Sequence, residues 1–143
     1  MAIRALGPGD EVVATEACRL FEAAGDVDPV AFLARPEAVL LVAEDEGAVV
    51  GWVYGHELVH PDGERTMLLY ALDVVEAAQG RGHGRALVTA FVDLARERGC
   101  TEVWVLTDDD NPAGLATYAS AAGTRDPDPQ VMFTWRLAEG RHS

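Results

Sequence analysis

The sequence predicts one α/β domain over residues 1–143, with a mixed, mostly antiparallel sheet flanked by helices. Two apolar stretches joined by Glu46-Gly47 indicate a β-hairpin. A glycine-rich stretch then separates a further strand from a long helix, whose apolar residues recur at three- and four-residue spacing. A second strand and helix follow it. The length is near the commonest size of a single domain.

The chain is predicted to begin with a short strand over Ala2–Leu6 and a helix that stops at Gly25. Asp28 is expected to cap a short second helix, with Pro29 at its first position. Arg35-Pro36 should end that helix, because the residue before a proline disfavours helical backbone.

The middle of the chain predicts three successive antiparallel strands. The hairpin consists of Val39–Asp45 and Ala48–Leu58, and Glu46-Gly47 forms its tight turn. A second turn, His60-Pro61-Asp62-Gly63, leads into a strand over Met67–Val75.

The C-terminal part predicts a long helix from about Gly82 to Gly99 and a buried strand over Val103–Leu106. Asn111 should cap the next helix, with Pro112 at its first position and its end at Gly123. A final strand is expected over Val131–Leu137.

The glycine-rich stretch is Gln79-Gly80-Arg81-Gly82-His83-Gly84. Glycines at a helix start let a ligand approach the backbone, and the free N–H groups there suit a phosphate. A dinucleotide fingerprint would need glycine where Arg85 stands, and a P-loop would need Lys followed by Ser or Thr. The same residues are also compatible with a simple glycine-rich turn.

The composition indicates which kinds of binding partner and which cellular compartment to expect. The formal net charge of −13 disfavours nucleic acid and anionic membranes and favours a cationic partner, although it also serves solubility. The N-terminus lacks the apolar core of a signal peptide and no apolar run is long enough to span a membrane, so we expect a cytoplasmic protein. The spacings of Cys18 with Cys100, and of His56 with His60, predict no metal site.

Three features resemble the GNAT superfamily of N-acetyltransferases. Gln79-x-x-Gly-x-Gly resembles the acetyl-CoA signature, and Asn111-Pro112-Ala113 with Tyr118 resembles the second signature, in which an asparagine meets the CoA arm and a tyrosine stands by the thiol. Leu72-x-Val74 is similar to the strand end that pairs with pantetheine. The order of elements also matches. This resemblance implies the GNAT fold, with its sheet splayed between the two central strands, and acetyl-CoA as cofactor.

The resemblance implies that cofactor contacts come from the end of the central strand, the glycine-rich stretch and the second signature. They are Leu72, Val74, Val75, Gln79, Gly80, Arg81, Gly82, His83, Gly84, Arg85, Asn111, Ala113 and Tyr118.

A narrower resemblance is to the small aminoglycoside 3-N-acetyltransferases of type I and their environmental relatives. It covers Phe21–Val27, Tyr70–Gly84 and the C-terminal region. Those enzymes carry acidic residues where this chain has Ala71 and Thr66. Asp73 lies two positions after Ala71, on the same strand face, and is expected to take over a carboxylate role.

Acetyl transfer to an amine needs a base, an acid for the leaving thiolate and a donor for the developing oxyanion. Asp73 is the first candidate base, because an acid on an otherwise apolar strand is costly unless solvated or paired, and Glu57 is the second. Tyr118 is the candidate acid, and a backbone N–H near Val74 or Val75 is the oxyanion donor.

Acidic residues are expected to recognise the amine, although each also suits a cap or a solvated turn. They are Asp26, Asp28, Glu57, Asp73, Asp108, Asp109 and Asp110. The leading hypothesis is therefore an acetyl-CoA-dependent N-acetyltransferase of a small cationic amine, with aminoglycosides first. An amino acid, a polyamine or a protein N-terminus as acceptor, and a non-catalytic acyl-CoA-binding module, remain alternatives. The oligomeric state stays open, a homodimer included.

Overall fold

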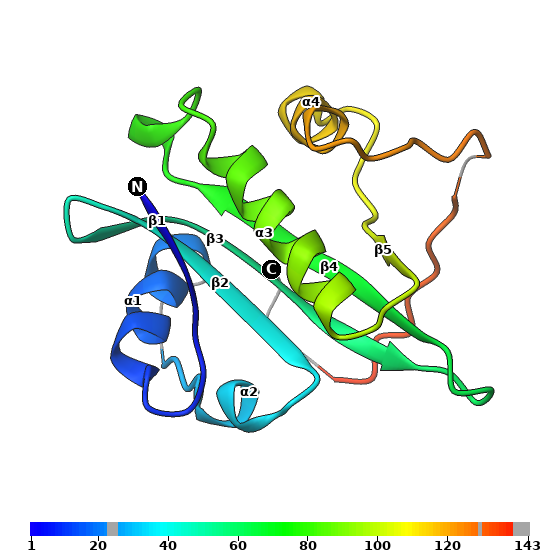
Figure 1. Ribbon diagram of the computed structural model, residues 1–143, viewed down its shortest axis with the longest axis horizontal. Coiled ribbons are helices and arrows are strands. Elements are labelled where there is room, and N and C mark those ends of the chain that lie inside the picture. The colour runs from blue at the N-terminus through cyan, green and yellow to red at the C-terminus, as the bar shows by residue number, and fades with distance from the viewer. Residues whose placement is uncertain (23–25, 129, 139–143) are drawn as a thin grey trace.

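The computed structural model describes residues 1–22, 26–128 and 130–138 (Figure 1). Its centre is one five-stranded sheet in the order β1-β2-β3-β4-β5. The strands are β1 (Ala2–Ala5), β2 (Ala38–Asp45), β3 (Ala48–Val59), β4 (Arg65–Val74) and β5 (Glu102–Trp104). The first four pair antiparallel and β5 pairs parallel to β4. The predicted mixed, mostly antiparallel sheet is confirmed.

Helices cover both faces of the sheet. They are α1 (Glu11–Phe21), α2 (Val30–Ala34), α3 (His83–Glu97) and α4 (Pro112–Ser120), and a short 3-10 helix, η1 (Glu76–Ala78), precedes α3. One core cluster joins α3 to the sheet around Phe91 and Met67. The other joins α1 and α2 to the opposite face around Trp52 and Leu33. In the described residues, every helix is too short or too polar to cross a membrane.

Local signals in the sequence set most of the turns. Glu46 and Gly47 both have positive φ, of 52° and 79°, as the predicted tight hairpin turn requires. The Asp28 carboxylate accepts a 3.1 Å hydrogen bond from the Val30 N–H, although the helix begins one residue later than predicted. Gly99 follows α3 with φ 83°. The predicted end of the first helix at Gly25 lies outside the described residues.

A β-bulge interrupts the β3–β4 pairing. Tyr54 pairs with Ala71, but the next residue, Gly55, pairs with Leu69, so Tyr70 is an extra residue on β4. A side chain at Gly55 would collide with the carbonyl oxygen of Leu68, which explains the glycine. The extra residue changes the alternation of β4 and brings the Tyr70 ring to the face that carries Tyr54.

Of the two strands predicted on the C-terminal side, the first is confirmed in part and the second is absent. The strand expected over Val103–Leu106 is shorter and only partly covered, and Leu106 is 61% exposed. The strand expected over Val131–Leu137 is absent, and its apolar side chains are at least 77% exposed. In Figure 1 this segment runs as an irregular trace beyond β5. Because β5 has only three residues, the segment finds no long edge on which a ladder can form.

Candidate active site

The glycine-rich stretch forms an open loop at the N-terminus of α3. Gly80 and Gly82 adopt left-handed backbone, with φ of 80° and 83°, and a Cβ on either would meet nothing within 4 Å. Gly82 is the N-cap and makes no side-chain cap. The first helical bond joins the Ala86 N–H to the Gly82 carbonyl, so the three preceding amides of α3 are left for a ligand. This geometry suits the phosphates of CoA.

The side chains of the loop have different roles. Arg81 and Arg85 are not buried, and no ion pair found among the described residues involves either guanidinium. The Gln79 amide donates a 3.1 Å hydrogen bond to the Val74 carbonyl, which ties the loop to the end of β4. Gly84 faces α4, and a Cβ there would lie 3.2 Å from Thr117 Cγ2. Glycine at this position therefore permits close packing of the two helices.

His83 lies beneath the loop rather than on its outer surface. Its side chain is buried, with Nδ1 2.7 Å from the sulfur of Met1. Its Nε2 has no partner within the described part of the chain. The predicted cofactor contact at this position is thus available from the backbone N–H and not from the imidazole.

The sheet is splayed beside the C-terminal half of β4. β5 pairs only with Thr66–Leu68, so β4 continues beyond it (Figure 1). The Val75 N–H donates to the Val50 carbonyl at 2.8 Å. Since paired residues alternate along antiparallel strands, Leu72 and Val74 turn their own backbone groups away from β3, toward the splay. The Val74 N–H is therefore compatible with the predicted role of oxyanion donor, whereas the Val75 N–H already donates to the Val50 carbonyl.

The second signature residues lie on α4 and its cap. The Asn111 Oδ1 accepts from the Gly114 N–H at 3.2 Å, and its Nδ2 donates to Thr107 at 3.1 Å. Both ends of this amide are thus used within the protein. The Ala113 carbonyl accepts from the Thr117 hydroxyl. The predicted cap is confirmed, while contact of Asn111 or Ala113 with CoA stays a prediction.

Tyr118 projects from α4 into a groove of about 430 Å³ between α3, β5 and α4. Burial raises the pKa of its phenol, and the negative charge of Asp73 raises it further. The hydroxyl therefore stays protonated at neutral pH, as a general acid must.

Asp73 is exposed on β4, opposite Trp52 on β3. The indole Nε1–H of Trp52 donates a 2.9 Å hydrogen bond to Asp73 Oδ2. Trp52 itself is buried, so a rigid core residue holds one carboxylate oxygen. Asp73 thus has a fixed carboxylate on the exposed surface of β4, and its role as a base stays a prediction.

Sequence reasoning missed part of this region. Glu22, at the end of α1, accepts a 3.1 Å hydrogen bond from the Tyr54 hydroxyl. The Tyr54 ring lies 5.1 Å from that of Trp52 and 5.5 Å from that of Tyr70. The alternation of Trp52 and Tyr54 along the predicted strand Ala48–Leu58 was the available signal. Nothing in the sequence indicates that Glu22 reaches them.

Other predicted residues lie apart from this group. Glu57 pairs with Arg65 at 3.2 Å and with Arg98 at 3.6 Å, near the opposite end of β3, and its side chain is only 8% exposed. Asp28 caps α2, and Asp26 is exposed between α1 and α2. The acidic residues Asp108, Asp109 and Asp110 are exposed in the loop before α4. The structure gives Glu57 a structural role in place of the predicted catalytic one.

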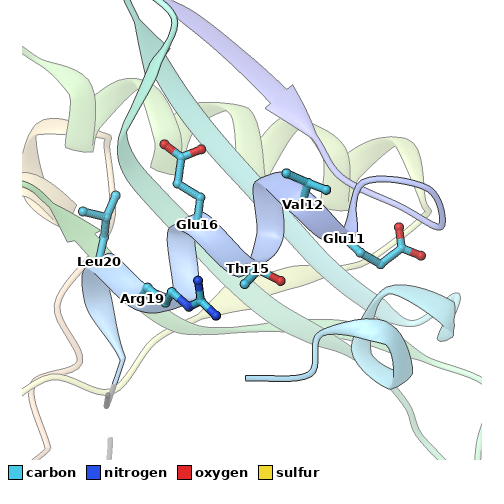
Figure 2. Close-up of a pocket in the computed structure, with 6 residues that line it drawn as sticks. All are labelled: Glu11, Val12, Thr15, Glu16, Arg19 and Leu20. Carbon is cyan, nitrogen blue, oxygen red and sulfur yellow. The ribbon is translucent and has the colours of Figure 1, made fainter. Parts of the chain in front are cut away.

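A separate shallow hollow lies on the outward face of α1 (Figure 2). Its six lining residues all belong to that one helix, and they include Glu11, Glu16 and Arg19. None of the predicted site residues contributes to it. It is therefore not part of the candidate active site.

The family assignment rests on residues 10–123, which match the Acetyltransferase (GNAT) family. The chain belongs to this family. Members of this family are acetyltransferases that use acetyl-CoA. The unbonded amides at the start of α3, with the exposed Arg81 and Arg85 beside them, are compatible with the CoA phosphates that members of this family bind.

Among sequence relatives, the L-2,4-diaminobutyric acid acetyltransferase of Nocardia farcinica is 33% identical over 85 residues. A mycothiol acetyltransferase of Amycolatopsis mediterranei is 38% identical over 88 residues. Each alignment covers 59% of this chain, but only 43% and 29%, respectively, of the relative. The chain thus spans less than half the length of these two relatives.

Solved structures share the fold. An aminoglycoside acetyltransferase, meta-AAC0020, from an uncultured soil metagenomic sample superposes with a TM-score of 0.88 at 24% identity, covering 96% of both chains. The same enzyme in complex with sisomicin gives a TM-score of 0.87 at 23% identity, again over 96% of both chains. AAC(6′)-Iy with a CoA-containing bisubstrate analogue gives 0.80 at 15% identity, over 95% of this chain and 98% of that one.

Proposed function

We propose that this enzyme transfers the acetyl group of acetyl-CoA to a primary amine of a small cationic molecule, with aminoglycosides as the first candidates. The observation that carries the proposal is the position of Asp73. Its exposed carboxylate is fixed by Trp52 beside the Tyr54 and Tyr70 rings, and its charge reaches Tyr118. An ammonium group bound to Asp73 would face the region where β4 extends beyond β5.

Each step of the proposed acetyl transfer is assigned to a different residue of this chain. Acetyl-CoA supplies an activated acetyl thioester. Asp73, directly or through a water, accepts a proton from the bound ammonium, and the neutral amine forms the new C–N bond. The Tyr118 hydroxyl donates its proton to the sulfur as the C–S bond breaks, and the phenolate regains a proton from the nitrogen of the tetrahedral intermediate, directly or through a water. The Val74 N–H, turned toward the splay, is placed to stabilise negative charge on the carbonyl oxygen.

Three observations support a cationic acceptor. The net charge of −13 favours encounter with polycations. Aromatic rings beside a carboxylate are a favourable environment for an ammonium group. A fold neighbour has been solved with sisomicin, an aminoglycoside. A diamino acid is the second candidate, because a sequence relative is named an L-2,4-diaminobutyric acid acetyltransferase.

The direct test incubates the protein with acetyl-CoA and single amines while thiol release is measured. The panel contains gentamicin, sisomicin, spermidine, polymyxin and L-2,4-diaminobutyrate. We expect turnover with an aminoglycoside and formation of a singly acetylated product by mass spectrometry. Turnover with diaminobutyrate alone would favour the second candidate, and no turnover with any cationic amine would refute the cationic acceptor.

A further inference from the structure

Two carboxylates lie against the row of rings formed by Trp52, Tyr54 and Tyr70, which we call the aromatic wall. Trp52 donates to Oδ2 of Asp73, and Tyr54 donates to Oε1 of Glu22. In the described part of the chain, no ion pair joins either carboxylate to a guanidinium or imidazole. Each has one oxygen held by an aromatic donor, and neither forms an ion pair within residues 1–22, 26–128 and 130–138.

The spacing of these carboxylates follows from β3. Trp52 and Tyr54 are two residues apart, so their Cα atoms are separated by about 7 Å and their side chains share one face. The pKa of Tyr54 is raised by burial first, then by Glu22, and also by the charges of Tyr70 and Asp73. Both carboxylates therefore act on one phenol, from two different elements of the fold.

The two carboxylates are not equivalent. Asp73 directly precedes Val74, the candidate oxyanion donor, on β4, whereas Glu22 follows α1 and contacts Tyr54 instead. Asp73 is thus the carboxylate assigned to the acetylated amine, and Glu22 is the second one. Tyr70, 54% exposed, presents its ring beside Tyr54 because of the bulge in β4.

We propose that Glu22 binds a second ammonium group of the acceptor and makes the site selective for diamines. This inference rests on the proposed function: one amino group lies at Asp73 for acetylation, and the other is held by Glu22. The Tyr70 ring, 5.5 Å from that of Tyr54 and half exposed, offers a face to a cation. Because the two aromatic donors are one two-residue step apart on β3, roughly 7 Å between Cα atoms, the preferred acceptor is a short diamine.

Glu22 also has a structural function that the test must separate from charge recognition. Its hydrogen bond to Tyr54 fixes the end of α1 over the sheet. Glu22→Gln keeps an oxygen that can accept from the Tyr54 hydroxyl and removes only the charge. The matched control is Glu16→Gln, because Glu16 lies on the outward face of the same helix (Figure 2) and its loss changes the net charge equally.

The experiment measures kcat and KM for 1,4-diaminobutane and butylamine with the wild type and both variants. We expect Glu22→Gln to raise KM for the diamine about tenfold, because the variant loses one charge-assisted hydrogen bond to the second ammonium group. Both kcat values should stay within about twofold, because Glu22 does not take part in the chemical step. The butylamine KM should also stay within about twofold, because butylamine has no second ammonium group for Glu22 to bind. Glu16→Gln should match the wild type with both amines.

An equal rise in KM for both amines, or an unchanged KM for the diamine, would overturn the inference. If the wild type acetylates neither amine, the proposed function fails for these acceptors, and calorimetry then decides the inference separately. In that case, the Kd values of the two amines are compared for CoA-saturated protein. The preference for the diamine must fall in Glu22→Gln, and an unchanged preference would contradict the role of Glu22.

Discussion

Trp52 on β3 and Asp73 on β4 face each other across the strand pair, and the Trp52 indole donates a 2.9 Å hydrogen bond to the Asp73 carboxylate. A buried ring thereby holds an exposed acid in one orientation beside the free edge of β4. The proposed binding and deprotonation of an ammonium group by Asp73 would thus depend on a residue of the core.

Trp52→Phe tests this orientation, because phenylalanine retains a ring but removes the Nε1–H. We expect kcat/KM for the best amine to fall about fivefold and the free energy of unfolding to fall by about 1–2 kcal/mol. Urea unfolding and steady-state kinetics measure the two effects. Trp104→Phe on β5 is the control, and an equal loss of kcat/KM in the control would argue against the specific hydrogen bond.

Tyr118→Phe should lower kcat by about 100-fold, as loss of a general acid does, without weakening acetyl-CoA binding. The hydroxyl is needed only when the sulfur leaves, whereas the ring continues to fill the groove. Single-turnover kinetics and calorimetric titration with acetyl-CoA separate chemistry from binding. An unchanged kcat would remove Tyr118 from the mechanism.

Gly82→Ala and Gly99→Ala form a matched pair at the two ends of α3. Both glycines have φ 83° and open space where a Cβ would lie, so each substitution should cost about 1 kcal/mol of stability. Only Gly82 borders the amides that meet the phosphates, so only Gly82→Ala should raise the Kd of acetyl-CoA, by about tenfold. Equal Kd values in the two variants would mean that the loop is not the phosphate site.

Glu57→Gln distinguishes a structural carboxylate from a catalytic one. The change breaks two ion pairs of a nearly buried side chain, so the free energy of unfolding should fall by about 1–3 kcal/mol. Because Glu57 lies near the opposite end of β3 from Trp52, kcat and KM should stay within about twofold. A large fall in kcat with unchanged stability would restore Glu57 as a base.

Alkaline pH should destabilise the fold through Tyr54 and Tyr118. Burial raises the pKa of both phenols in the folded protein, so the unfolded chain releases these protons at lower pH. The free energy of unfolding therefore falls as pH rises above about 10, the ordinary pKa of tyrosine. Urea unfolding at pH 8 and pH 10.5 measures the fall. The fall in the free energy of unfolding should be smaller in Tyr118→Phe. A fall as large as in the wild type would show that Tyr118 does not contribute to the loss of stability at alkaline pH.

The sequence predicted the features that depend on local chemistry. The hairpin turn at Glu46-Gly47, the start of α3 after Gly82 and the cap at Asn111 follow from residues that favour particular backbone conformations or cap a helix. The order of elements, with these motifs, also predicted the family. By contrast, Val131–Leu137 has the alternation of a strand, but strand formation needs a partner edge, which local propensity does not supply.

The composition of the acceptor region was decided by tertiary structure. An extra residue in β4 turns Tyr70 toward Tyr54, and the packing of α1 on the sheet brings Glu22 to the Tyr54 hydroxyl, 32 positions away in sequence. The pairing of β3 with β4 and the packing of α3 bring Arg65 and Arg98 to Glu57. The sequence alone determined the fold family and the glycine-rich loop at the start of α3, because both are encoded in short contiguous motifs. Only the folded chain decided which carboxylates lie against Trp52 and Tyr54, because strand register and helix packing set those distances.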